Sequence, residues 1–230
     1  MRFGPVPVAQ ALGAVLAHAV PLPGGGKLKK GRVLGAQDLV ALRAAGLAQV
    51  IAARLDPGDV GEDAAAARLA AALVPDPAAA GLRIEAPFTG RVNIRATGPG
   101  VMALDVAAVN ALNGVDPMIT LATVPPLQRV TEGMMVGTVK IISYAVPEAA
   151  LMQACAAGAG AMARLSPCVG TADLIVTETA PGTAAQDDKG GRAVWARVAR
   201  LGIAQGQTRI VPHDTASVAA AIAGAQADMV

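Results

Sequence analysis

The chain has 230 residues, of which 53% are hydrophobic, 16% charged and 2% aromatic. This composition excludes an intrinsically disordered chain, which would be poor in apolar residues, and a collagen-like repeat, which would need a strict glycine period. Nineteen Lys and Arg against 17 Asp and Glu leave a formal net charge of +2, too small for the basic surface that nucleic-acid binding usually requires. We therefore expect one large globular domain or two small ones, with no nucleic acid as a partner.

The cysteine content and the N-terminal sequence bear on the compartment. Cys155 and Cys168 are too few for a disulfide framework and lie outside any Cys/His cluster of zinc-binding type. The first five residues lack the continuous apolar stretch of a signal peptide, and the later Ala-rich segments are interrupted by Arg, Asp or Pro. The sequence predicts a cytoplasmic protein with reduced thiols, no cluster of metal-ligating residues and no membrane association.

Residues 1–157 are expected to form an N-terminal mixed, β-rich α+β domain. Its first half should contain a short helix leading into a strand, a hairpin edge, a helix followed by Gly46, a strand and a second helix, over residues 6–20, 27–34, 37–45, 47–55 and 62–73. Asp59 and Glu62 have the spacing of a capping box for that second helix.

The second half of this domain changes to short alternating runs. Residues 82–146 contain these runs, separated by turn signals such as Thr89-Gly90, and indicate a mostly antiparallel β arrangement interrupted by a helix near residues 106–112. Residues 147–157 are expected to be helical. Gly and Pro are frequent in residues 158–170, which we interpret as a linker.

Residues 171–230 alternate between strand and helix patterns. The expected order is strand, helix, strand, helix and the start of a third strand, over residues 172–177, 192–201, 208–211, 216–225 and 227–230. This is the βαβαβ order of an open parallel sheet, and the overall fold class is therefore α/β. A chain that ended here would leave an apolar strand unpaired at the edge of the sheet, so we expect the natural chain to continue past Val230.

The loop after the first strand of this second domain is the leading candidate for a ligand site. It runs from Thr177 to Gly191 at the carboxyl end of a strand, where its hydroxyls and helix-start amides suit an anion such as phosphate. It has neither the glycine fingerprint of dinucleotide binders nor that of phosphate loops. An ordinary solvated loop explains it equally well.

Three other polar clusters have simpler explanations. His213 and Asp214 follow the second strand and could orient a ligand, although Asp214 as a helix cap is favoured. A basic run could bind phosphate, although a solvated hairpin face is favoured; it consists of Lys27, Lys29, Lys30 and Arg32. An acidic run lacks the ligand spacing of a calcium loop and is explained more simply by helix capping; it consists of Asp56, Asp59, Glu62 and Asp63.

Two segments of the C-terminal part carry motifs of a known family. Gln186-Asp187-Asp188-Lys189-Gly190 is similar to the Asp-Lys-Gly segment that opens a helix in the molybdopterin-binding domain of molybdenum cofactor biosynthesis proteins. Ile210-Val211-Pro212-His213-Asp214 is similar to its Ile-Pro-Asp-Asp strand end, with His213 where many members have the first Asp.

The N-terminal part carries the same resemblance over nearly the whole chain. The segment from Lys30-Gly31-Arg32 through Asp38 to Gly46 resembles the region that precedes the pterin domain in gephyrin-like molybdotransferases. Three further segments resemble a bacterial group of molybdopterin-binding proteins, namely Val60–Asp63, Ala86–Val92 and Val139–Ile142.

The resemblance implies that residues 171–230 form the first half of a Mog-like three-layer domain, whose distinctive Thr/Gly/Ser loop would follow Val230. It implies binding of molybdopterin or a nucleotide-linked molybdenum cofactor at the carboxyl edge of the sheet, with Mg²⁺ or molybdate as further ligands. The residues it assigns to ligand binding are Thr177, Glu178, Thr179, Gly182, Thr183, Asp188, Lys189, His213 and Asp214.

Activity and partners stay open at the level of sequence. Pterin binding alone does not distinguish a molybdotransferase from part of a nucleotidyltransferase pathway, and no catalytic residue is assigned. The resemblance implies a homo-oligomer that works with other cofactor-biosynthesis proteins. The alternative is a non-enzymatic interaction module that retains the fold without binding the pterin.

Overall fold

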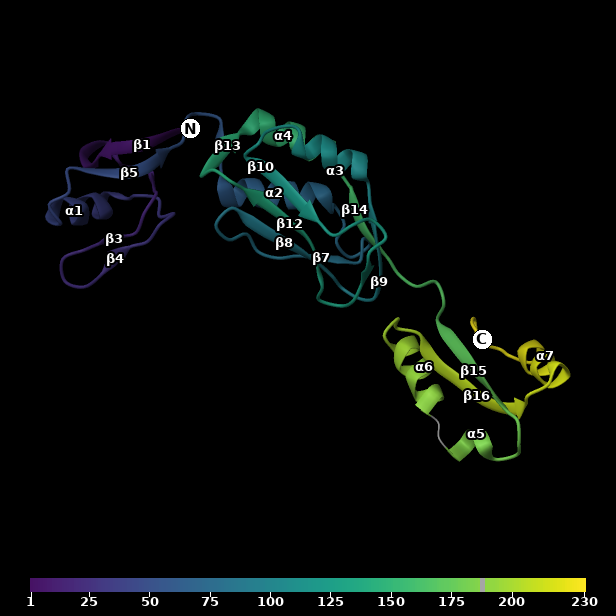
Figure 1. Ribbon diagram of the computed structural model, residues 1–230. Coiled ribbons are helices and arrows are strands. Elements are labelled where there is room, and N and C mark those ends of the chain that lie inside the picture. Colours follow the sequence, from purple (N-terminus) through teal and green to yellow (C-terminus); the bar gives the residue numbers. More distant parts are fainter. Residues whose placement is uncertain (187–188) are drawn as a thin grey trace. The chain divides into compact units, whose positions relative to one another are not determined.

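The computed structural model describes residues 1–186 and 189–230 as a mixed α/β protein with several small sheets (Figure 1). The chain divides into two compact units. Unit 1 comprises Met1–Arg95, Leu104–Val124 and Met135–Ala163, and unit 2 comprises Ala96–Ala103, Pro125–Met134 and Arg164–Val230. Among the helices described, none combines the length and the hydropathy that crossing a bilayer requires.

Unit 1 begins with a three-stranded sheet of order β1-β5-β2, in which β5 pairs antiparallel with both neighbours. The strands are β1 (Arg2–Pro7), β2 (Val15–Leu16) and β5 (Gln49–Arg54). β5 confirms the predicted strand at residues 47–55. The short helix predicted at the start of residues 6–20 is wrong, because the end of β1 and a 3-10 turn η1 (Val8–Gln10) stand there, whereas the strand predicted after it is present as β2 and the start of β3 (Val20–Pro21).

The sequence pattern explains that error. Val6 and Val8 are buried while Pro5 and Pro7 are exposed, which is the period of two expected for a strand. Proline also lacks the N–H that a helix interior needs. The pairing of β1 with β5 therefore overrides the apolar periodicity that favoured a helix.

The segment between β3 and the first helix is held by one buried carboxylate. β3 pairs with β4 (Lys27–Leu28), and α1 (Ala36–Ala44) follows, with Gly46 at a φ of +74° after its end as predicted. Asp38 is only 6% exposed, and its Oδ2 accepts hydrogen bonds from Arg32 Nε at 2.8 Å and from the Gly35 amide at 2.9 Å. The hydrogen bond from Arg32 holds the pKa of the Asp38 carboxyl below its ordinary value.

The next elements are a short antiparallel pair and the longest helix of the unit. β6 (Asp59–Gly61) pairs with β13 (Ala145–Pro147), and α2 (Glu62–Leu73) occupies the predicted residues. The predicted capping box is wrong. Gly61 is the N-cap of α2, and the Asp59 carboxylate accepts from the Asp56 amide at 2.8 Å instead.

A four-stranded antiparallel sheet of order β10-β12-β8-β7 completes unit 1 and confirms the expected β arrangement. Its strands are β7 (Leu82–Ile84), β8 (Arg91–Ala96), β10 (Ile119–Thr123) and β12 (Met135–Ile141). α2 packs on β12, and α3 (Val106–Asn113) packs on β10 and on α4 (Glu148–Ala157) (Figure 1). The core between them contains the fully buried side chains Leu69, Leu73, Ile94, Leu112, Ile119, Ile141 and Leu151.

A third sheet has the order β11-β9-β14. Its strands are β9 (Gly100–Leu104), β11 (Arg129–Val130) and β14 (Met162–Leu165). β14 lies inside the range 158–170 that the sequence analysis interprets as a linker. That interpretation is wrong for these four residues, because they pair with β9.

Unit 2 contains the only parallel strand pairing of the described residues outside an isolated bridge. β15 (Thr171–Glu178) pairs with β16 (Ala204–Pro212) over nearly their full lengths. The connecting helices are α5 (Thr183–Gln186) and α6 (Lys189–Ala199), and α7 (Thr215–Ala223) follows β16. The predicted order of first strand, helix, second strand and second helix is therefore confirmed, and the parallel sheet that the described residues show is one short pair.

In place of the expected strand over residues 227–230 there is one parallel bridge, from Met229 to Ala172. The Asp228 carboxylate anchors this turn by accepting from the amides of Gly170 and Thr171, each at 2.9 Å. Met229 thus lies beside β15 on the side opposite β16, and the strand order reverses at β15. α6 and α7 accordingly lie on opposite sides of the pair (Figure 1).

The register of the parallel pair depends on a bulge that only glycine fits. Ala172 pairs with Gln205 and Leu174 pairs with Thr208, so β16 carries one extra residue. The buried Asp173 carboxylate accepts from the Gln207 amide at 2.7 Å. A Cβ on Gly206 would overlap Asp173 Oδ1 and lie 2.8 Å from the Ala172 carbonyl oxygen.

Replacing Asp38 with alanine should destabilise unit 1, because Arg32 and the Gly35 amide lose a buried acceptor. We expect the free energy of unfolding to fall by about 2 kcal/mol in urea denaturation followed by circular dichroism. Because the folded-state pKa of Asp38 is lowered, its contribution is present above the ordinary carboxyl pKa and lost as the pH falls through the lowered one. The difference between the two proteins should therefore shrink in acid, and the exposed Glu132→Ala should change little.

Replacing Gly206 with alanine should weaken the β15–β16 pairing. Trp195 is the single tryptophan and belongs to unit 2, so its fluorescence reports unfolding of this unit. The matched control is Gly190→Ala in α6, where an added Cβ meets no atom within 4 Å. We expect a lower denaturation midpoint for the first variant and an unchanged or raised one for the second. Equal midpoints would contradict the close contact at Gly206.

Candidate functional site

The carboxyl ends of β15 and β16 bring together residues that the sequence analysis assigned to ligand binding. Thr177 pairs with Val211 and Glu178 with Pro212, so the next residue, His213, lies at the same edge. The Nδ1 of His213 is 2.9 Å from the Thr177 hydroxyl oxygen, and its amide donates to the Glu178 carbonyl at 2.9 Å. Thr177 and His213 are both exposed, so this pair is accessible from solvent.

The loop after β15 folds back on Glu178. The Glu178 carboxylate accepts from the amides of Gly182 at 3.0 Å and Ala184 at 3.4 Å. The Thr183 hydroxyl donates to the Ala180 carbonyl at 2.7 Å, whereas Thr179 is exposed. The polar groups of Glu178 and Thr183 therefore hold the loop in shape. Thr179 is exposed, and its hydroxyl makes no such bond with the residues that the structure describes.

Asp214 caps α7, as the simpler sequence interpretation has it. Its carboxylate accepts from the Ser217 amide at 2.8 Å and from the Ser217 hydroxyl at 2.7 Å. The bond from the Ser217 amide is the main cause that lowers the pKa of Asp214. The residue thus places a negative charge beside His213.

His213 and Asp214 also line an open pocket of about 470 Å³. Its other lining residues include Val218 and Ile222 on the apolar side of α7. Polar groups at one end and an apolar ledge at the other are typical of small-molecule sites. Lys189 is the exposed first residue of α6, while Asp188 lies outside the described residues. The structure therefore joins Thr177, Glu178, His213 and Asp214 at one edge.

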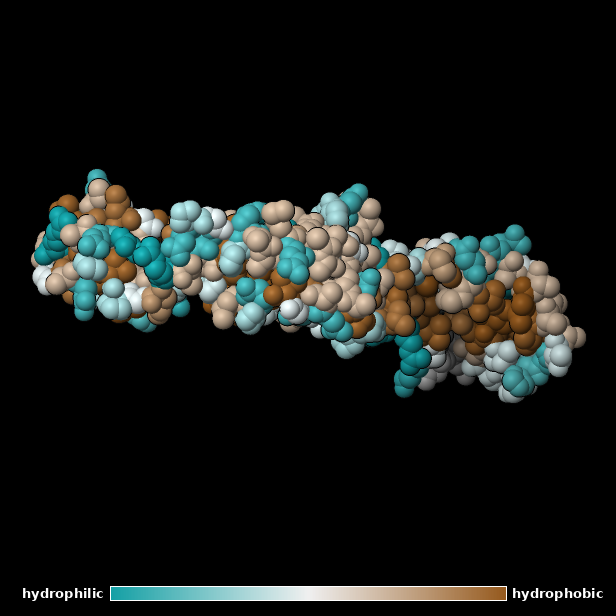
Figure 2. Space-filling model, turned by 90° about the horizontal axis from the view of Figure 1, so that it is seen from above, coloured by the Kyte–Doolittle hydropathy of each residue, from teal (hydrophilic) through white to brown (hydrophobic). Residues whose placement is uncertain are grey.

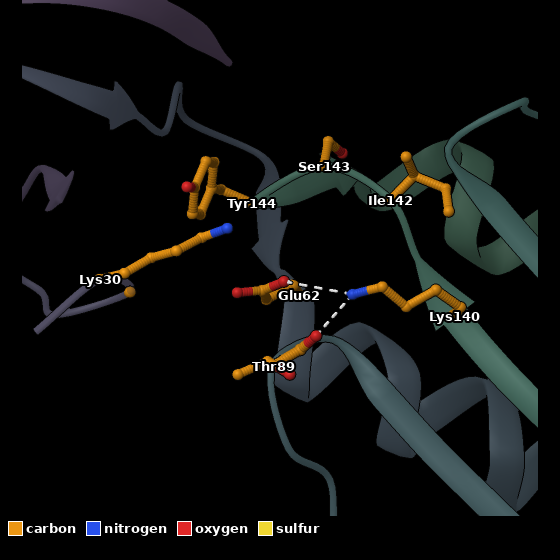
Figure 3. Close-up of a pocket in the computed structure, with 8 residues that line it drawn as sticks. Lys30, Glu62, Thr89, Lys140, Ile142, Ser143 and Tyr144 are labelled. Atoms are coloured by element: carbon orange, nitrogen blue, oxygen red, sulfur yellow. Dashed lines mark hydrogen bonds and ion pairs between the residues drawn. The ribbon is translucent and has the colours of Figure 1, made fainter. Parts of the chain in front are cut away.

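A second cavity, in unit 1, was missed by the sequence analysis. It has a volume of about 370 Å³ and is lined by Lys30, Glu62, Thr89, Lys140, Ile142 and Tyr144, among others (Figure 3). Lys30 and Glu62 belong to runs interpreted as a solvated hairpin face and as helix capping. No spacing in the sequence indicates that Lys30 and Glu62 line one cavity with Lys140, which comes 78 positions after Glu62.

The charges of this cavity influence one another. Lys140 Nζ donates to the Thr89 carbonyl at 2.6 Å and lies 4.0 Å from Glu62 Oε2. Burial raises the pKa of the Glu62 carboxyl, against the opposing effect of Lys140. Across residues 1–186 and 189–230, no three His, Cys, Asp or Glu side chains are grouped so as to hold a metal ion.

Comparison with known proteins yields one match. A family model described as a domain of unknown function (DUF8806) matches residues 5–54, the segment from the second half of β1 to the end of β5, which includes Asp38. No curated protein and no solved structure shows significant similarity to the chain.

Proposed function

We propose that the chain binds molybdopterin, or its nucleotide-linked form, at the carboxyl edge of β15 and β16, as a protein of molybdenum cofactor biosynthesis or handling. The observation that carries the proposal is the Thr177–His213 pair at that edge. It is supported by the resemblance of the Asp188-Lys189 segment and of the Ile210–Asp214 strand end to the pterin-binding family. On this proposal, residues 171–230 are part of a Mog-like three-layer domain.

The side chains at the edge suit the two ends of such a ligand. The imidazole of His213 and the hydroxyls of Thr177 and Thr179 offer hydrogen bonds to a phosphate. The apolar ledge of Val218 and Ile222 offers a surface for the pterin ring. A cation such as Mg²⁺ would depend on Asp188, which lies outside the described residues. The proposal is limited to binding, because no group at the edge is assigned a chemical step.

An interaction module is the second candidate. The Glu178 carboxylate and the Thr183 hydroxyl are engaged within their own loop, which leaves fewer groups for a ligand. Ile210 and Ile222 are 46% and 53% exposed, and apolar residues gather on the visible face of unit 2 (Figure 2). Exposed apolar surface of this kind is typical of sites that contact another protein.

Titration with molybdopterin, followed by Trp195 fluorescence, separates the two candidates. We expect saturable binding by the unaltered chain and a loss of about tenfold in affinity for His213→Ala and for Thr177→Val. The matched control is His18→Ala, because His18 is the other of the two histidines and is exposed in unit 1. Absence of binding, or equal affinity in all variants, would favour the interaction module.

A substitution at Asp214 tests the charge of the ligand. Asparagine keeps the cap of α7 because it is an equally good N-cap residue, but it removes a negative charge beside His213. If an anionic phosphate binds there, Asp214→Asn should bind molybdopterin more tightly than the unaltered chain, while the thermal midpoint stays nearly the same. Weaker binding by this variant would show that Asp214 contacts the ligand as an acceptor.

A further inference from the structure

The cavity of unit 1 collects two amino groups that face one carboxylate. Lys30 follows β4, Glu62 begins α2 and Lys140 belongs to β12. Lys30 and Lys140 point toward Glu62 from opposite sides, and the Tyr144 ring lies above Lys30 (Figure 3). The distance from Lys30 Nζ to the centroid of that ring is 6.0 Å. Among these charged lining groups, positive charge exceeds negative charge by one.

The floor of the cavity is a hairpin turn held in an unusual conformation. Thr89 and Gly90 have φ angles of +49° and +70°, and the turn is closed by hydrogen bonds between Phe88 and Arg91. Positive φ at both central positions is the pattern of a type I′ turn, and this conformation is unfavourable for a β-branched residue such as Thr89. Strain of this kind persists only where the surroundings enforce it, and it is found often at functional sites.

Three contacts enforce the turn. The Gly90 amide donates to Asp63 Oδ1 at 2.6 Å, and the Gly90 carbonyl accepts from the Ile141 amide at 2.8 Å. A Cβ on Gly90 would lie 2.8 Å from the Ile141 carbonyl oxygen, so the turn and β12 approach as closely as glycine permits. The Thr89 carbonyl is thereby fixed where it accepts from Lys140 Nζ.

From this arrangement we infer that the cavity is a binding site for a small organic phosphate, with the phosphate group between Lys30 and Lys140. The Tyr144 ring and the exposed side chain of Ile142 form the apolar wall for the rest of the ligand. Two amino groups suit the charge of a phosphate, and a cavity of about 370 Å³ has room for a compact substituent. The site lies in unit 1, and its occupant is independent of any ligand at the β15–β16 edge.

Glu62 gives this site a pH dependence. The groups that face it are Lys140 from β12, Lys30 from the segment after β4, Tyr144 from the segment after β12, and Asp63 from α2 itself. A phosphate between the two lysines would raise the proton affinity of Glu62 further, since like charges repel. Binding should therefore take up a proton and strengthen as the pH falls toward the titration range of Glu62.

Calorimetric titration with inorganic phosphate and with phenyl phosphate tests the site. We expect both to bind saturably, with phenyl phosphate tighter because of the apolar wall. Lys30→Gln and Lys140→Gln should each weaken binding about tenfold. The matched control is Lys29→Gln, which removes the same charge from an exposed neighbour of Lys30 outside the cavity and should bind as the unaltered chain does.

Because Lys140 also bonds the Thr89 carbonyl, each variant is checked for an unchanged circular dichroism spectrum and thermal midpoint. The exposed Lys30 keeps the test decisive if Lys140→Gln fails to fold. No binding of either phosphate, or equal weakening by Lys29→Gln and Lys30→Gln, would overturn the proposal. Lys30→Gln should bind molybdopterin as the unaltered chain does when the titration is followed by Trp195 fluorescence, which separates this result from the test of the pterin site.

The Glu62→Gln variant isolates the linkage to pH. Sulfate serves as the probe because its own charge stays constant across the range. Sulfate affinity of the unaltered chain should rise from about pH 8 to about pH 5, whereas Glu62→Gln should bind more tightly at the higher pH and show a flatter profile. An equally steep profile in this variant would show that Glu62 does not face the anion.

Discussion

The parallel pairing of β15 with β16 is the constraint on which the candidate pterin site depends. It places Thr177 and His213, which are 36 residues apart, within 2.9 Å of each other. The pairing in turn requires the bulge at Gly206. The Asp173 carboxylate there accepts a hydrogen bond from the Gln207 amide and leaves no room for a side chain at position 206. A backbone detail near the amino end of β15 thus sets the alignment of the groups at its carboxyl end.

The two cavities illustrate different ways of building a polar site. The edge of unit 2 takes its groups from the ends of adjacent strands, so its members are set by topology. The cavity of unit 1 takes Lys30, Glu62 and Lys140 from three separate segments, and the Thr89 carbonyl holds Lys140 in place. In both, a carboxylate lies beside the groups that would contact an anion, Asp214 in one and Glu62 in the other, and it opposes anion binding. Replacing either acid with its neutral amide should therefore strengthen anion binding at its site.

Local signals made much of the fold predictable. The range of α2 follows from its alanine-rich sequence, and the glycine after α1 follows from the preference of glycine for positive φ. Prediction failed where pairing between distant segments decided the structure, as in β1, where strand pairing overrode the helical interpretation, and in β14, which pairs with β9. The same limit applies to the sites. Adjacency at a sheet edge joined Thr177 to His213 in advance, whereas no local pattern connects Lys30 with Lys140.

Tyr144 has a consequence for the order in which the protein folds during synthesis. Its hydroxyl donates to the carbonyl of Ala17, 127 positions earlier, and its ring stacks on Phe3 with a centroid separation of 5.9 Å. Contacts of such high sequence separation form late, because the loop they close carries a large entropic cost. The first strands therefore emerge from the ribosome long before Tyr144 does. Phe3 is 58% exposed in the folded chain, and a chain arrested before residue 144 would present it without its stacking partner, with more of its ring open to chaperones and to aggregation.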